Sequence, residues 1–246
     1  MAITLDSMVK ISAASQNVNT QAVDVFKRAE GRVAQQINAT EVNLSAFGKI
    51  KAGFAELQSA GKALADPKKT ATAEDVKKAA QSFADAYNNA NKAINTAIKG
   101  DGKVSGALGD DGRARLAGND LKKIVVGGNN SANLKNIGIN INQDGSMSVD
   151  AKAFQNAMQA NPNAVKDTLA RIGGQAEQVS KKELSSSGNV GSAVNTLNSR
   201  AKSLETQMAE QQKIASASQA TVQRQVANIG STAAGGIAAY MQMFSL

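Results

Sequence analysis

Apolar side chains recur three and four positions apart between residues 18 and 66, a spacing that places them on one face of a helix. The clearest run comprises Phe47, Ile50, Phe54, Leu57, Gly61 and Leu64. It predicts a long N-terminal helical region that ends where Asp66-Pro67 prevents the helix from continuing. Residues 1–17 are polar with weak periodicity, so we expect a mobile N-terminal segment until a partner binds it.

A second and longer heptad pattern spans residues 190–229 and predicts a C-terminal coiled-coil helix. Its two rows are Val190, Leu197, Leu204, Gln211, Ser218 and Gln225, and Val194, Ala201, Met208, Ala215, Val222 and Ile229. Apolar size falls along these rows and polar residues enter, which suits packing that forms on assembly. Gly230, Gly235 and Gly236 predict a break in the helix, followed by an uncharged apolar tail over 230–246.

Residues 72–183 carry mixed signals and predict a small central α+β module. Thr72 and Asp75 fit a capping box, which would open a helix. The apolar face of that helix comprises Val76, Ala80, Phe83, Tyr87, Ala90 and Ile94. Residues 100–113 are rich in Gly and Asp and predict a loop, after which 120–126 predicts a short helix or a helix end.

Strand periodicity appears once, over residues 136–150. Ile137, Ile139 and Ile141 alternate with small polar residues, and Asp144-Gly145 supplies the turn of a β-hairpin. Asp150 then caps a helix, and Asn161-Pro162 starts another. The fold class predicted is mainly α: long antiparallel terminal helices forming a coiled-coil leg, with a small central α+β module containing the hairpin.

The composition limits the catalytic, metal-binding and partner classes that the chain can have. The 246 residues include no Cys and no His, which excludes thiolate and imidazole catalysis and the metal sites built from those residues. The net charge of +8 comes from dispersed pairs such as Lys68-Lys69 and Lys181-Lys182, typical of solvated helix faces rather than a nucleic-acid surface. No apolar run reaches the roughly 18 residues that a membrane-spanning helix needs. The N-terminus lacks the layout of a cleavable signal peptide.

Three local patterns resemble a binding or catalytic site, but the residues in each argue against one. Asn140, Asn142, Asp144, Gly145 and Ser148 have calcium-loop spacing, but Ala151 replaces the closing Glu, so a hairpin turn is favoured. The glycines at 100–112 lie among aspartates that would repel phosphate. Asp110-Asp111 lacks an apolar wall that would raise either pKa. We therefore predict no enzyme, cofactor or metal site.

Self-association is the remaining chemical expectation. The tail could lie on a membrane or contact a partner, and the absence of Lys and Arg after Arg224 favours self-association. The helical rows could equally hold a single molecule together, and both interpretations stay open. Candidate self-association residues are Phe47, Ile50, Phe54, Leu57, Leu197, Leu204, Met208, Val222, Ile229, Ile237, Tyr240 and Phe244.

Four segments in order resemble the flagellar hook-associated protein 2 family, the flagellar filament-capping proteins. They are RVAQQINATEVNLSAFGKIKAGFAELQSAGKAL (32–64), AAQSFADAYNNANKAI (79–94), GALGDDGRARLAGNDLKKIV (106–125) and NIGININQDGSMSVDAKAFQNAMQANPNAV (136–165). The resemblance implies a helical leg built from the two termini and a homo-oligomeric ring, commonly a pentamer, at the filament tip. It implies contact with flagellin or other axial proteins, and export without a cleavable signal by the flagellar type III apparatus to the cell exterior.

The chain also departs from the family pattern. The large variable insert usual after the first long helix is reduced to ADPKKTAT (65–72), and the usual Gly-Ser-Gly-Leu-Asp N-terminus is missing. A shortened member could serve instead as an accessory or junction axial protein. A general helical self-associating module without capping activity is the other alternative.

Overall fold

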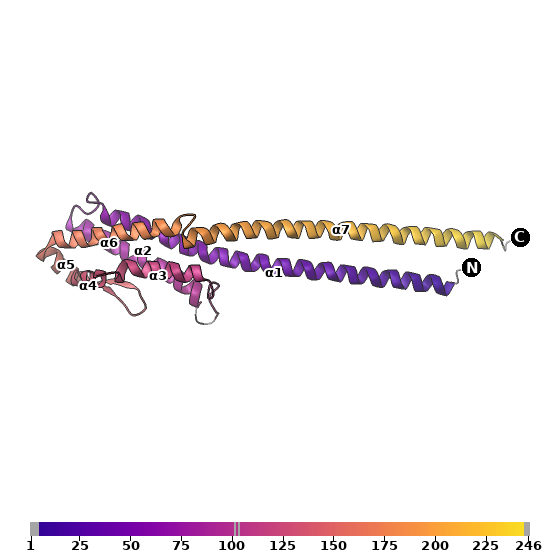
Figure 1. The fold of residues 1–246 in the computed structure, drawn as a ribbon, viewed down its shortest axis with the longest axis horizontal. Helices are drawn as coiled ribbons and strands as arrows, with labels where there is room; N and C mark the ends of the chain where they lie inside the picture. The colour runs from indigo at the N-terminus through magenta and orange to yellow at the C-terminus, as the bar shows by residue number, and fades with distance from the viewer. Residues whose placement is uncertain (1–4, 101, 103, 244–246) are drawn as a thin grey trace. The chain divides into compact units, whose positions relative to one another are not determined.

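The computed structural model describes residues 5–100, 102 and 104–243, and helices dominate this part of the chain. The mainly α fold class with a central β-hairpin is therefore confirmed (Figure 1). The elements in order are α1 (Leu5–Ala65), α2 (Ala73–Lys99), α3 (Gly112–Val126), α4 (Asn130–Asn136), β1 (Ile139–Ile141), β2 (Met147–Val149), α5 (Ala151–Ala160), α6 (Pro162–Leu184) and α7 (Asn189–Met243).

The chain forms two compact units, and the long terminal helices contribute to both. Unit 1 comprises residues 1–39 and 200–246, and unit 2 comprises residues 40–199. In unit 1, the beginning of α1 and the end of α7 run side by side in opposite directions (Figure 1). The expected antiparallel arrangement of the chain's terminal helices is thus observed.

The ends of the terminal helices differ in part from expectation. α1 already begins at Leu5, inside the segment 1–17, whose mobility stays a prediction. α1 ends at Ala65, as Asp66-Pro67 requires. α7 continues to Met243, so the expected break at Gly230, Gly235 and Gly236 is wrong. A helical Gly costs only about 1 kcal/mol relative to Ala, and alanines on both sides of Gly235-Gly236 favour the helix.

Unit 2 holds the hydrophobic core, and α2 lies at its centre. The face of α2 predicted from Val76 to Ile94 is buried, and α2 packs against α3 and α6. α1 approaches α2 so closely that a Cβ added to Gly53 would meet the Ala90 Cα at 2.8 Å. Phe47, Phe54 and other apolar side chains of α1 complete the core of this helical bundle.

Helix starts in unit 2 are set by side-chain caps. The Thr72 hydroxyl accepts a hydrogen bond from the Asp75 N–H while the Asp75 carboxylate accepts one from the Thr72 N–H, the predicted capping box. The hydrogen bonds from Thr72 hold the pKa of the Asp75 carboxyl below its ordinary value. Asp150 caps α5, and Asn161 caps α6 with Pro162 in its first turn, as the sequence indicated.

The hairpin joins α4 to α5, and its turn lies where the sequence predicts it. Ile139 pairs with Val149 and Ile141 with Met147, and Gly145 adopts a φ of +79° in the turn. The sequence analysis missed α4, which precedes the hairpin, and recognised only residues 120–126 of α3, as a short helix or a helix end. α3 begins at Gly112 because the Asp111 carboxylate accepts hydrogen bonds from the N–H groups of its first turn.

Candidate interaction surface

In unit 1, exposure of the α7 side chains follows the heptad. Leu204 is buried, and the other members of the predicted rows from Ala201 to Val222 are half-buried, while most residues between them are exposed. We call this set the α7 seam: Ala201, Leu204, Met208, Gln211, Ala215, Ser218 and Val222. α1 shows a matching row in which Val33 is buried and Phe26 and Ile37 are half-buried. The two predicted heptad rows therefore correspond to one partly covered face of α7.

One polar atom in the α7 seam is buried and lacks a hydrogen bond to any described residue. Gln211 Oε1 finds no hydrogen-bond partner within the part of the chain that the structure describes. Leaving a buried amide oxygen unpaired costs about 1–3 kcal/mol. A polar residue at a heptad core position is also the usual device for fixing helix register and subunit number. Gln211 thus marks the seam as a surface suited to further pairing.

The candidate self-association residues occupy three environments. Phe47, Ile50, Phe54 and Leu57 have exposures of 0% and belong to the core of unit 2. Those near or in the α7 seam are Leu197, Leu204, Met208 and Val222. The side chains of Ile229, Ile237 and Tyr240 lie outside the described residues, as does Phe244 altogether. Self-association through these residues stays a prediction.

An asparagine of α2 holds the hairpin in place. The Asn88 amide donates to the Met147 carbonyl at 2.8 Å and accepts from the Met147 N–H at 2.7 Å, so it satisfies both backbone groups of one β2 residue. Asn91 donates to the carbonyl of Asp144 in the turn at 3.4 Å. Sequence analysis missed this role. The available signal was a row of asparagines at helical spacing, Asn88, Asn91 and Asn95.

The hairpin turn uses the side chains that resembled a calcium loop. The Asp144 carboxylate accepts hydrogen bonds from the Ser146 N–H at 2.9 Å and hydroxyl at 2.7 Å, which lower the pKa of Asp144. Asn142 donates to the same hydroxyl at 2.8 Å. The predicted hairpin turn is confirmed, and the polar side chains close it. Among the described residues, no group of three or more carboxylates could hold a metal ion.

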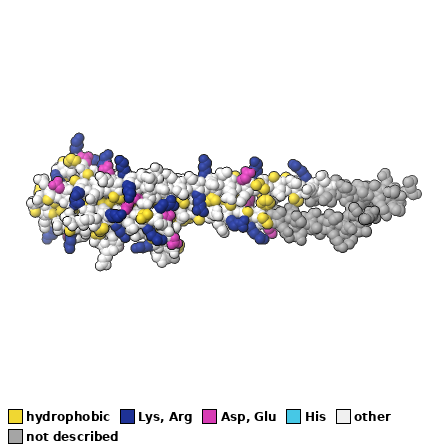
Figure 2. Space-filling view, in the orientation of Figure 1, with side chains coloured by type: hydrophobic (Ala, Val, Ile, Leu, Met, Phe, Trp, Pro, Cys, Tyr) yellow, Lys and Arg dark blue, Asp and Glu magenta, His cyan; other side chains and the backbone are white. Residues whose placement is uncertain are grey.

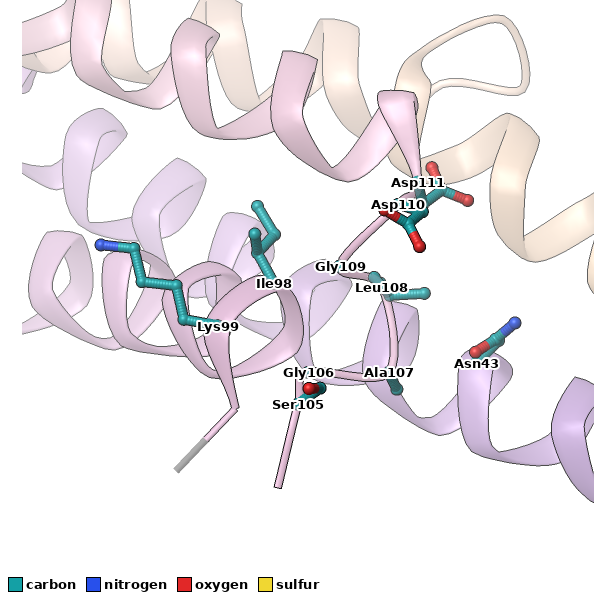
Figure 3. Close-up of a pocket in the computed structure, with 10 residues that line it drawn as sticks. All are labelled: Asn43, Ile98, Lys99, Ser105, Gly106, Ala107, Leu108, Gly109, Asp110 and Asp111. Carbon is teal, nitrogen blue, oxygen red and sulfur yellow. The ribbon is translucent and has the colours of Figure 1, made fainter. Parts of the chain in front are cut away.

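A cleft of about 530 Å³ lies beside the loop 105–111, between the start of α3 and residues of α1 and α2 (Figure 3). Asp111 caps α3, and Asp110 forms an exposed ion pair with Arg115 at 3.7 Å. Lys99 points away from both aspartates (Figure 3). Each carboxylate therefore has a structural partner, and the arrangement offers no acid–base pair.

A polar cluster around buried Glu183 ties α3 and α6 to the first turn of α7. Asp120 accepts hydrogen bonds from Lys123 and Lys182, both at 2.8 Å, and Asn189 donates to Glu183 Oε1 at 2.9 Å. Burial opposes ionisation of Asp120, but hydrogen bonds from Lys123, Lys182 and Glu183 outweigh it and lower its pKa to about 2. Burial, together with the adjacent Asp120 carboxylate, raises the pKa of Glu183. Sequence analysis did not detect this cluster.

A second open cleft, of about 600 Å³, runs between α1 and α2 and reaches the loop that follows α2. Its walls are mostly apolar, with Lys49 on the α1 side and Lys92 on the α2 side. We call it the α1–α2 groove. Its apolar lining residues are Val42, Ala46, Ala93, Ala97, Val104 and Ala107.

On the described part of the face that Figure 2 shows, basic side chains are spread out and do not gather in one dense patch. This distribution agrees with the dispersed lysine pairs in the sequence. Within the described residues, no helix has the length and apolar character needed to cross a membrane.

The comparison with protein families decides the identity of the chain. The family model described as "Flagellar hook-associated protein 2 C-terminus" matches residues 69–233. The chain belongs to the flagellar hook-associated protein 2 family. No curated protein matches it.

In the flagellar hook-associated protein 2 family match, the aligned region runs from the loop before α2 into the last third of α7. The resembling segments 79–94, 106–125 and 136–165 lie inside the match, and 32–64 lies outside it. The first of these segments contains Asn88, and the third contains the hairpin that Asn88 holds. The match also includes the α7 seam, so the surface described above is part of the family's C-terminal region.

Proposed function

We propose that this protein assembles as a homo-oligomer at the distal end of the flagellar filament and promotes the addition of flagellin there. Membership of the flagellar hook-associated protein 2 family carries the proposal. The protein would leave the cell through the flagellar type III export apparatus without a cleavable signal peptide, and it would act outside the cell. Flagellin or other axial proteins would be its partners.

The α7 seam supplies the physical argument for assembly. Its core positions include Gln211 with an unpaired buried oxygen, and the small residues Ala215 and Ser218. Packing of such a seam within one chain contributes little stabilising free energy, because little apolar area is buried per heptad. Additional helices from neighbouring subunits would bury more of this area and could satisfy Gln211. We therefore place self-association at α7, with the apolar residues 230–246 as a further contact.

A structural role agrees with the chemistry of the described residues. Three carboxylates that resemble part of a catalytic or metal site instead form an ion pair, cap a helix and close a turn: Asp110, Asp111 and Asp144. The family itself is one of flagellar structural proteins. The function proposed is therefore binding and guidance of subunits rather than a reaction.

A junction or accessory axial role is the second candidate. α1 and α2 are joined by residues 66–72 alone, at the place where the resemblance puts a large insert. If capping in the family depends on that insert, this chain would bind axial proteins without closing the filament tip.

Deletion of the gene tests the proposal. A capping function predicts that flagellin accumulates as monomer in the culture medium, that filaments are short or missing, and that the wild-type gene restores both. Normal filaments without flagellin in the medium would contradict capping. A strain lacking flagellin itself is the matched control for the immunoassay of the medium.

A further inference from the structure

The α1–α2 groove is an apolar surface that remains open to solvent. Val42 on α1 is 56% exposed and Val104 in the loop after α2 is 70% exposed, although both are large apolar residues. They lie beside the alanines that line the groove. Exposed apolar residues gathered at one concave place indicate a contact with another protein more strongly than scattered ones do.

The charge at the groove is of one sign. Lys49 and Lys92 line it, and no Asp or Glu is among the residues that do so. Neither lysine forms an ion pair with any described residue. The groove therefore fits a partner that presents a large apolar side chain close to a carboxylate.

The same chain carries a segment with these properties on α7. Ile214 is 50% exposed and is the one large apolar residue classed as exposed in the described part of that helix. Glu210 lies one turn earlier and is exposed, so its side chain projects on the same face as Ile214. This face, which we call the Ile214 face, comprises the exposed residues Glu210, Ile214 and Ala217 and is separate from the α7 seam.

We infer that the α1–α2 groove of one copy receives the Ile214 face of α7 from a second copy, with Glu210 next to Lys49 and Lys92. The groove and the face are different surfaces, so each copy offers one of each. Such a heterologous contact repeats from subunit to subunit and closes a ring when the rotation permits. The inference rests on the proposed homo-oligomer and names a contact that it uses.

Disulfide trapping between two differently tagged chains tests the contact, and the absence of Cys from the chain provides a clean background. Val42→Cys in one chain and Ile214→Cys in the other should give a mixed disulfide on mild oxidation, because bridged Cα atoms lie within about 7 Å. Val126→Cys replaces an equally exposed valine, 53% exposed on α3, and is the matched control. We expect the mixed disulfide at least several-fold faster with Val42→Cys than with Val126→Cys.

Charge reversal provides the second arm. Lys49→Glu with Lys92→Glu should weaken self-association about fivefold, as expected for two exposed ion pairs, and Glu210→Lys in the same chain should restore it. Equal trapping at Val42 and Val126 in a protein that still oligomerises would overturn the inferred contact while leaving the proposed function in place. A protein that stays monomeric throughout would overturn both.

Discussion

Asn88 shows how a single polar side chain can connect a helix to a hairpin. Its amide replaces the neighbouring strand that β2 lacks on one side, because it pairs with both the N–H and the carbonyl of Met147. Two strands of three residues each are too short to be stable alone, so the hairpin depends on this attachment and on its apolar face.

We predict that Asn88→Ala lowers the free energy of unfolding by about 1–3 kcal/mol, because it leaves the backbone of buried Met147 unpaired. Asn89→Ala is the control, since Asn89 is exposed and donates only to Glu56. Its effect should stay within about 0.5 kcal/mol. Denaturant unfolding measures both. Equal effects would show that the attachment contributes nothing to stability.

The stability of the folded protein depends on pH through Glu183, and the surroundings of Glu183 set the sign of that dependence. The pKa of Glu183 is raised in the folded protein above its ordinary value of 4.5, by burial first and by Asp120 second. Its stabilising contribution is therefore complete below the unfolded-state pKa and is lost as the pH rises through the folded-state pKa. The charged groups that face it are Asp120 and Lys182.

We predict that Glu183→Gln matches the wild type in acid and unfolds at a higher denaturant concentration near neutral pH. The amide stays neutral and can still pair with Asp120, so the variant avoids the cost of a buried charge. Glu177→Gln, on the same helix, is the control. Identical pH profiles of stability for Glu183→Gln and the wild type would contradict the assignment.

At the scale of elements, much of unit 2 follows from local sequence signals. The Thr72–Asp75 capping box, the Asp144-Gly145 turn and Asn161-Pro162 each specify a boundary through hydrogen bonds within a few residues. Such signals are readable because both partners are close in the chain. The same reasoning failed at Gly112, where a glycine was assigned to the loop although Asp111 caps the helix that begins there.

Contacts between distant segments could not be predicted from the sequence. Asn88 with Met147, and Lys182 with Asp120, join residues 59 and 62 positions apart. The asparagine row of α2 indicates a shared helix face but does not name Met147 as its partner, and nothing in the periodicity of α6 singles out Lys182. The heptad rows of α7 could be predicted, because the repeat alone shows which residues share one face of the helix.

The crossing of α1 and α6 gives a prediction at the level of elements. A Cβ added to Gly173 would lie 2.5 Å from the Gly61 carbonyl oxygen, whereas one added to Gly174 would meet nothing within 4 Å. We predict that Gly173→Ala destabilises the protein by about 1–3 kcal/mol by forcing the helices apart. Gly174→Ala should stabilise it by about 0.5–1 kcal/mol, because Ala favours the helix. Thermal unfolding of the two variants compares neighbouring glycines directly, and effects of the same sign would refute the close crossing.

For the whole molecule, the proposed oligomer assembles through α7. Leu204→Asp places a charge in the α7 seam, where the wild-type side chain is only 7% exposed. We predict that the variant loses its oligomers and elutes as a single chain in size-exclusion chromatography with light scattering. Gln207→Asp, at an exposed position of α7, should leave the oligomer unchanged. An unchanged mass for Leu204→Asp would exclude the seam from the interface.

The position of the protein on the flagellum distinguishes capping from a junction role. Antibodies raised against the purified chain, visualised by gold labelling in electron microscopy, would show where it sits on intact filaments. The proposal predicts label at the distal tip of the filament. Label at the junction of hook and filament, or none on the flagellum, would contradict the proposed capping function.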